Sequence, residues 1–153
     1  MHNRKYSLII IDMQPSFLSN SQRRVKENCA KLIASAKKDK SPIIFVEYSY
    51  SGKTIPSLLD EAKFAKRFFV TKDDDDGSFE IESCIRDNKI TSNHIKVAGV
   101  NTECCVYATV KGLVKRFPHS TIEVISSACD SMYSHKTGLS SMKKYMPGNV
   151  VLS

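Results

Sequence analysis

The chain has 153 residues, of which 41% are hydrophobic and 25% are charged. These values are ordinary for globular proteins, so they argue against a disordered chain, a fibrous repeat or a membrane protein, and the length predicts one domain over residues 1–153. The 23 Lys and Arg against 16 Asp and Glu give a net charge of +7. Because the basic residues are scattered and no aromatic residues alternate with them, we expect no nucleic-acid partner.

The N-terminal sequence and the cysteines predict a cytoplasmic protein. Only four consecutive apolar residues precede Asp12, too few for a signal peptide or a membrane span. The five cysteines are odd in number and form no C-x-x-C pair. This pattern favours free thiols in a reducing compartment over disulfides or a zinc site. We therefore expect a cytoplasmic location and no membrane partner.

Strand and helix signals alternate along the chain. The first apolar run, Tyr6 to Ile11, is typical of a strand buried on both faces. From Ser21 to Lys40 apolar residues recur every three or four positions, which predicts an amphipathic helix. The same signals predict strands at 43–48, 67–71, 95–99, 122–125 and 150–152, and helices within 49–65 and at 79–88, 102–117 and 136–145. This order predicts an α/β fold: a Rossmann-like, three-layer α/β/α sandwich with a mostly parallel sheet of five to six strands.

Three polar residues lie where the predicted strands end. In an open parallel sheet, ligands bind at the carboxyl ends of the strands. Asp12 ends the first strand, Lys72 ends the third, and Cys105 lies in the first turn of the helix after the fourth. A thiol with a carboxylate and a lysine combines a nucleophile, its base and an electrostatic helper. Taken singly, the three also fit structural roles, as a packed cysteine, a loop cap and a surface charge.

Helix geometry distinguishes the adjacent residues Cys104 and Cys105. At about 100° per residue, Cys104 projects nearly opposite the apolar stripe of its helix and is expected to face solvent or a partner chain. Cys105 flanks the stripe and can face the strand ends. With Thr102 as the N-cap, free backbone amides and the helix dipole would favour a Cys105 thiolate. We therefore expect Cys105 to be the reactive cysteine.

Four segments of the chain form a recognisable pattern: LIIIDMQPSF with Asp12, VTK with Lys72, GVNTECCV with Cys105, and SACDS followed by His135. In these segments the chain resembles the isochorismatase-like cysteine hydrolases, the superfamily of nicotinamidases, isochorismatases and carbamoylsarcosine amidases. The resemblance spans about residues 6–152. It implies hydrolysis of a small amide or a related C–N bond through a thioester, and we expect a small-molecule substrate, no cofactor and a homo-oligomer.

The resemblance also implies a role for each residue. Asp12 would accept the thiol proton, and the Cys105 thiolate would attack a carbonyl carbon to give a thioester. Lys72 would hold Asp12 in place. Asp12 would pass the proton to the departing amine and then activate water. The oxyanion would be held by backbone amides at Val100–Asn101, where the family has a non-proline cis peptide, and at Cys105.

The pocket wall and metal content are predicted from the segments beside these residues. The candidates for the pocket wall are Phe17, Glu47, Tyr48 and Tyr50. Nicotinamidases of the family carry an Asp-x-His metal site after the second strand, whereas FVEYSYSGKT contains no histidine. We therefore expect no metal. The run Asp73–Asp76 is interpreted as a solvated turn, because adjacent carboxylates cannot all converge on one ion.

Two other functions remain open beside amide hydrolysis. The first is vinyl ether hydrolysis of the isochorismatase type, in which Asp12 would donate a proton and Cys105 would matter less. The second is a catalytically idle scaffold of the same fold, used for oligomerisation or protein binding. The presence of Asp12, Lys72 and Cys105 together argues against an idle scaffold.

Overall fold

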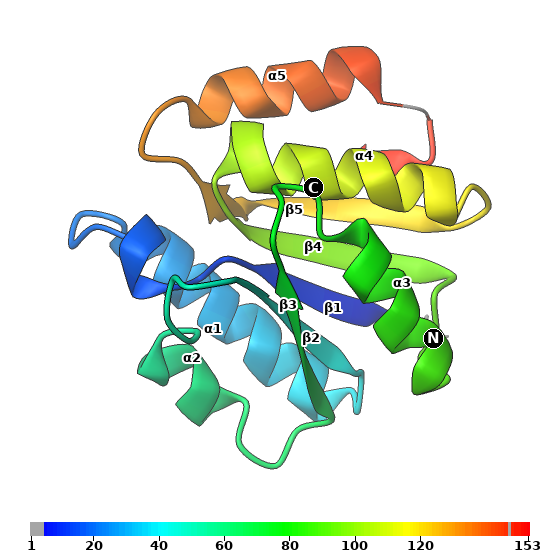
Figure 1. Cartoon of the computed structure of the whole chain (residues 1–153), viewed down its shortest axis with the longest axis horizontal. Coiled ribbons are helices and arrows are strands. Elements are labelled where there is room, and N and C mark those ends of the chain that lie inside the picture. Colours follow the sequence, from blue (N-terminus) through cyan, green and yellow to red (C-terminus); the bar gives the residue numbers. More distant parts are fainter. Residues whose placement is uncertain (1–4, 147) are drawn as a thin grey trace.

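The protein forms a six-stranded parallel sheet with helices on both faces, as a computed structural model describes for residues 5–146 and 148–153 (Figure 1). The sheet order is β3-β2-β1-β4-β5-β6, and every pair of neighbouring strands is parallel. The predicted Rossmann-like α/β/α sandwich is thereby confirmed. The strands are β1 (Ser7–Ile11), β2 (Ile43–Tyr48), β3 (Arg67–Lys72), β4 (His94–Val100), β5 (Thr121–Asp130) and β6 (Val150–Leu152). The α-helices are α1 (Arg23–Lys38), α2 (Pro56–Glu61), α3 (Ser78–Asp87), α4 (Tyr107–Arg116) and α5 (His135–Tyr145).

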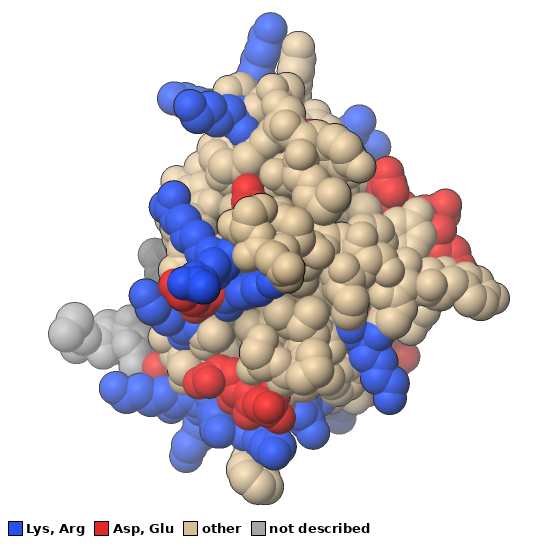
Figure 2. Space-filling view, turned by 90° about the vertical axis from the view of Figure 1, so that its left-hand side faces the viewer, with Lys and Arg blue, Asp and Glu red and all other residues tan. Residues whose placement is uncertain are grey.

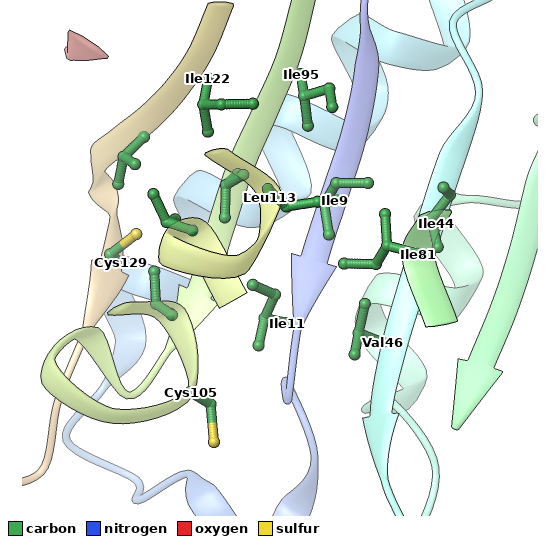
Figure 3. Packing of buried hydrophobic residues seen from close by; sticks show 14 of the residues in the cluster. Ile9, Ile11, Ile44, Val46, Ile81, Ile95, Cys105, Leu113, Ile122 and Cys129 are labelled. Carbon is green, nitrogen blue, oxygen red and sulfur yellow. The ribbon is translucent and has the colours of Figure 1, made fainter. Parts of the chain in front are cut away.

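Two hydrophobic clusters lie on opposite faces of the sheet. Successive side chains of a strand point to opposite faces, so Ile9 and Ile11 of β1 join one cluster while Leu8 and Ile10 join the other. The first cluster packs on α3, α4 and α5, and the second packs on α1 and α2. Figure 3 shows side chains of the first cluster on the near side of the sheet, in front of β1 and its neighbouring strands. Because every residue of β1 is buried, this strand lies at the centre of the molecule.

Two elements extend differently from their sequence predictions. The strand expected at 122–125 continues to Asp130, because it follows β4 past an irregularity between Val97 and Gly99. The helix expected at 102–117 begins with a π-helical turn, η2 (Thr102–Val106), before α4 starts at Tyr107. In that turn the carbonyl of Asn101 accepts from the amides of both Cys104 and Val106, at 3.0 and 3.2 Å. The second bond spans five residues, which is the π-helical pattern.

A short 3-10 turn, η1 (Pro15–Phe17), follows β1. The carboxyl ends of β1, β4 and β5 lie at the left of Figure 1, and η1 and η2 lie at the same end. Of the helices in the described ranges, none is long and apolar enough to cross a bilayer.

Candidate active site

Asp12 and Lys72 form a buried ion pair at the carboxyl ends of β1 and β3. The distance from Lys72 Nζ to Asp12 Oδ2 is 3.1 Å, and the two side chains are 0% and 1% exposed. Strand β2 lies between β1 and β3, so the long lysine side chain reaches past it. Its ammonium group lies 3.9 Å from the centre of the Tyr48 ring at the end of β2. A buried ion pair is stable only when its two charges lie this close together, because each charge alone is costly to bury.

The backbone at Asp12 turns where β1 leaves the sheet. Its amide still donates to the carbonyl of Val46 in β2, at 2.9 Å. Its φ is 53°, a left-handed conformation that Asp and Asn adopt more readily than most residues. Nearby, Gly99 of β4 has a φ of 129°, and a Cβ there would lie 2.1 Å from the carbonyl oxygen of Ile11. Only glycine therefore allows β4 to approach β1 this closely.

Backbone groups of the loop after β3 hold Lys72. Its ammonium donates to the carbonyls of Asp74 and Asp75, at 3.0 and 3.2 Å. Gly77 covers the lysine stem, since a Cβ at that position would lie 2.9 Å from Lys72 Cδ and 3.2 Å from Val46 Cγ1. The loop thus surrounds Lys72 and directs its charge toward Asp12.

Cys105 lies in η2 at the margin of the first hydrophobic cluster. It is 7% exposed, and Figure 3 shows its sulfur pointing away from Ile11, beyond the end of β1. Burial raises the pKa of the Cys105 thiol, and the nearby Asp12 carboxylate raises it further, while Lys72 opposes both effects. Burial likewise raises the pKa of Asp12, against the lowering effect of Lys72. The carboxylate and the thiol are thus close enough for each to shift the pKa of the other.

The expected N-cap at Thr102 is wrong, and the surroundings of Cys105 raise its pKa where a helix start was expected to lower it. Thr102 does not act as an N-cap, because it is the first residue of η2, and the N-cap position is that of Asn101, which makes no side-chain capping hydrogen bond. The Thr102 hydroxyl instead lies 2.7 Å from Nδ1 of His135. Burial raises the pKa of Cys104 as well, with a further contribution from Glu103. The raised pKa of Cys105 favours its protonated form, whose proton a neighbouring group would accept when it reacts.

The predicted oxyanion peptide and two of the four pocket-wall candidates lie at this site, and the other two candidates point elsewhere. The Val100–Asn101 peptide bond is cis. Phe17 and Tyr48 pack together beside the ion pair, with ring centres 6.0 Å apart. Glu47 turns away to Thr54, whose amide and hydroxyl donate to it at 2.6 and 2.9 Å. Tyr50 is fully exposed.

Sequence reasoning missed two residues at this end of the sheet. The buried Gln14 ties the end of β2 to the turn after β1: its side-chain amide donates to the carbonyl of Tyr48 at 3.0 Å and accepts from the Tyr48 backbone amide at 2.8 Å. Asp75 lies against Cys105, with 3.7 Å from the sulfur to Oδ1. Gln14 is part of the LIIIDMQ segment that carried the resemblance, whereas nothing in the sequence separates Asp75 from the three aspartates beside it.

Two observations concern other kinds of site. Within residues 5–146 and 148–153, no group of three or more His, Cys, Asp or Glu is arranged to hold a metal ion. A cavity of about 780 Å³ lies at the opposite end of the sheet, among Tyr6, Phe68 and His94, and it contains none of the predicted site residues. The chemistry that suits catalysis is therefore at the carboxyl ends of the strands, where open parallel sheets bind ligands.

Comparisons with known proteins agree with this geometry. A family model, described as the isochorismatase domain, matches residues 6–153. The fold is similar to that of the nicotinamidase SaPncA from Staphylococcus aureus, with a TM-score of 0.80, 18% identity, and coverage of 97% of this chain and 98% of that chain. It is also similar to N-carbamoylsarcosine amidase from Thermoplasma acidophilum, with a TM-score of 0.80, 14% identity, and coverage of 97% and 95%.

A third similar structure is the MAR1 ribonuclease from Caenorhabditis elegans, with a TM-score of 0.80, 20% identity, and coverage of 97% of this chain and 76% of that chain. The search of curated proteins gave no match. At these identities the solved structures show a shared fold. Because the family model covers nearly all of the sequence, the chain belongs to the isochorismatase family.

Proposed function

We propose that this protein is a cysteine-dependent hydrolase that cleaves a C–N bond in a small amide or a related compound through a thioester. The observation that carries the proposal is the buried Asp12–Lys72 pair, 3.1 Å apart, next to a cysteine whose pKa responds to both groups. Two structures of similar fold are named as a nicotinamidase and an N-carbamoylsarcosine amidase, which supports the same class of bond. We further propose that the enzyme acts in the cytoplasm as a homo-oligomer, without a cofactor.

Asp12 is the proposed proton acceptor in the first step. As the Cys105 sulfur bonds to the carbonyl carbon, its proton moves to Asp12 and the carbonyl oxygen becomes an oxyanion. A carboxylate suits this role better when its pKa is raised toward neutral pH, and burial has that effect on Asp12. Lys72 keeps Asp12 ionised and correctly placed. The backbone amides at Val100–Asn101 and at Cys105 are proposed to bind the oxyanion.

The remaining steps return the enzyme to its starting state. The C–N bond breaks as Asp12 gives its proton to the departing nitrogen, which leaves an acyl group on the Cys105 sulfur. A water molecule then attacks this thioester and gives a proton to Asp12. When the C–S bond breaks, the carboxylic acid departs and the proton returns from Asp12 to the sulfur. Phe17 and Tyr48 are proposed to form part of the pocket wall, and Glu47 and Tyr50 are less suitable because of their positions.

The test is a panel of amides that includes nicotinamide, N-carbamoylsarcosine and simple aliphatic amides. Ammonia release measures turnover, hydroxylamine traps a thioester as a hydroxamate, and mass spectrometry locates any acyl group on the chain. We expect turnover of at least one amide and an acyl adduct on Cys105 that Cys105→Ala abolishes. Cys104→Ala is the matched control and should retain turnover. Turnover that survives Cys105→Ala would overturn the mechanism, and no turnover and no adduct with any amide would favour an idle scaffold.

A further inference from the structure

Asp75 brings a second carboxylate to the candidate nucleophile. Its Oδ1 accepts from the Cys105 thiol at 3.7 Å and from the Tyr48 hydroxyl at 3.4 Å. The first carboxylate is that of Asp12, which is buried and paired with Lys72. Asp75 differs from it because its side chain is exposed. A molecule that approaches Cys105 can therefore reach Asp75, whereas Asp12 is covered.

The backbone of Asp75 is held in place by long-range hydrogen bonds. Its carbonyl accepts from Lys72 Nζ at 3.2 Å and from the hydroxyl of Thr109 in α4 at 3.3 Å. The same Thr109 hydroxyl accepts from the amide of Gly77 at 3.0 Å. The loop after β3 is thus fastened to α4 on one side and to Lys72 on the other. This anchoring places the carboxylate beside Cys105 independently of the neighbouring aspartates.

The charges around Cys105 do not balance. Two carboxylates, Asp12 and Asp75, face a single ammonium group, that of Lys72, which leaves one negative charge in excess. No Lys, Arg or His of the described ranges forms an ion pair with the Asp75 carboxylate. Apart from the Lys72 ammonium at 3.1 Å, neither oxygen of Asp12 has a hydrogen-bond partner among the described residues. Figure 2 faces this end of the molecule and shows several acidic side chains that lie close to Lys and Arg side chains on its surface.

This excess charge matters for the reaction. Once the thiol proton has moved to Asp12, the negative charge of Asp12 passes to the oxyanion, so the site keeps its one excess negative charge. Backbone amides can stabilise the oxyanion, but they do not neutralise Asp75. A positive group on the substrate next to Asp75 would make the site electrically neutral, both when the substrate binds and in the transition state. An anionic substrate would instead meet a like charge.

We propose that Asp75 is a specificity-determining residue, which selects substrates that carry a cationic group, such as an ammonium or guanidinium, close to the scissile C–N bond. This inference rests on the proposed function, because it assigns a substrate class to the same site. Asp75 is not needed as a second base, because the buried Asp12, which shifts the pKa of the Cys105 thiol, already has an ammonium partner. Its exposed position suits contact with the substrate.

Charged thiol reagents test the inference without a known substrate. Trimethylammonioethyl, methyl and sulfonatoethyl methanethiosulfonate carry a positive, a neutral and a negative group. With each reagent the thiolate attacks the thiosulfonate sulfur, a mixed disulfide forms and methanesulfinate leaves. Every protein in the series carries Cys104→Ser, and peptide mass mapping follows the rate at Cys105. All three rates depend on the same fraction of thiolate, and the intrinsic reactivity of each reagent is constant, so a change of their ratio between variants reports a change in local charge.

The expected ratio change follows from the loss of one charge. A unit charge about 6 Å from the reagent, in water, changes the rate of each charged reagent by about threefold, in opposite directions. The ratio of cationic to anionic rates should therefore fall about tenfold in Asp75→Asn. Asp73→Asn is the control, because it removes the same charge from the same loop and Asp73, unlike Asp75, makes no hydrogen bond with Cys105. It should change the ratio less than threefold. Equal ratios in the two variants would overturn the inference.

A second measurement uses turnover. The substrates γ-aminobutyramide, valeramide and succinamate share an amide and differ in the charge at the other end. We expect kcat/KM to favour the cationic amide over its neutral isostere, and Asp75→Asn to remove that preference while turnover of the neutral amide persists. If Asp75→Asn lowers kcat/KM equally for all three, Asp75 acts in the chemistry itself and the inference is wrong. If reagent selectivity changes as expected but no amide is hydrolysed, the proposed function fails and the charge preference stands.

Discussion

Replacing Lys72 by Met tests the buried ion pair directly. Met has nearly the same length and shape as Lys, so the change removes the ammonium group with little change in packing. It leaves the Asp12 carboxylate, 1% exposed, without its partner at 3.1 Å. It also removes the donor to the carbonyls of Asp74 and Asp75. Breaking a buried pair in this way is strongly destabilising, because one uncompensated charge stays in the interior.

Protonation of Asp12 limits the loss of stability. The unfolded chain ionises this group with its ordinary pKa of 3.8. At about 1.4 kcal/mol per pH unit, keeping Asp12 protonated in the folded state costs about 4 kcal/mol at pH 7 and about 1.6 kcal/mol at pH 5. Burial already raises the pKa of Asp12 in the wild type, so the wild-type protein already bears part of this cost in its free energy of unfolding. We therefore expect Lys72→Met to lower the free energy of unfolding by about 3 kcal/mol at pH 7 and by about 1 kcal/mol at pH 5.

The sign of the pH dependence follows from proton binding. A carboxyl whose pKa is raised in the folded state binds more protons when folded, so it lowers stability as the pH rises from the unfolded pKa through the folded pKa. Urea unfolding followed by far-UV circular dichroism measures the effect, since the chain has no Trp. Lys63→Met is the control: it breaks the exposed Lys63–Asp60 pair, 3.8 Å apart, and should change stability by less than about 0.5 kcal/mol. A loss in Lys72→Met no larger than in this control, or equal at the two pH values, would refute the reasoning.

The other predictions concern catalysis. Measured by ammonia release, Cys105→Ala should lower amide turnover by about 10³-fold or more, and Cys104→Ala by less than about tenfold. The reverse result would show that the reactive cysteine is assigned one residue out of register. A chelator should leave turnover unchanged, and loss with recovery on adding zinc or manganese would reveal metal ligands. In a pH–rate profile, kcat/KM should fall as the pH drops through the raised pKa of Asp12, because the protonated acid cannot accept the thiol proton. Asp75→Asn should move that limb to lower pH, since the Asp75 carboxylate raises the pKa of Asp12, and a move to higher pH would contradict the assignment.

The positions of Asp12, Lys72 and Cys105 at strand ends could be predicted from local patterns. The buried strand signal before Asp12 and the β-rich run before Lys72 each occupy a few consecutive residues. Parallel connections then bring the carboxyl ends of all these strands to one edge. The structure places Lys72 3.1 Å from Asp12, even though β2 lies between their strands. That distance depends on the full length of the lysine side chain and on the cover provided by Gly77.

The protonation of Cys105 could not be predicted in the same way. Viewed along the helix alone, a cysteine in the first turn is near free amides and a favourable dipole. In the folded protein, burial and the Asp12 carboxylate outweigh that effect and raise the pKa of the thiol. The π-helical turn has a similar origin, because the Asn101 carbonyl accepts two amides at the point where β4 ends.

The sequence by itself determined the succession of strands and helices along the chain, the burial of the first strand on both faces and the edge at which the polar residues gather. These properties follow from hydrophobic periodicity and from the handedness of parallel connections, which act over short stretches of chain. Only the tertiary structure decided which of the four aspartates at 73–76 faces Cys105. The four are equivalent in sequence, and Asp75 is selected because Lys72 and Thr109 bind its carbonyl from other elements. Charge balance around a nucleophile is a sum over groups that lie far apart in the sequence, so it exists only once the chain has folded.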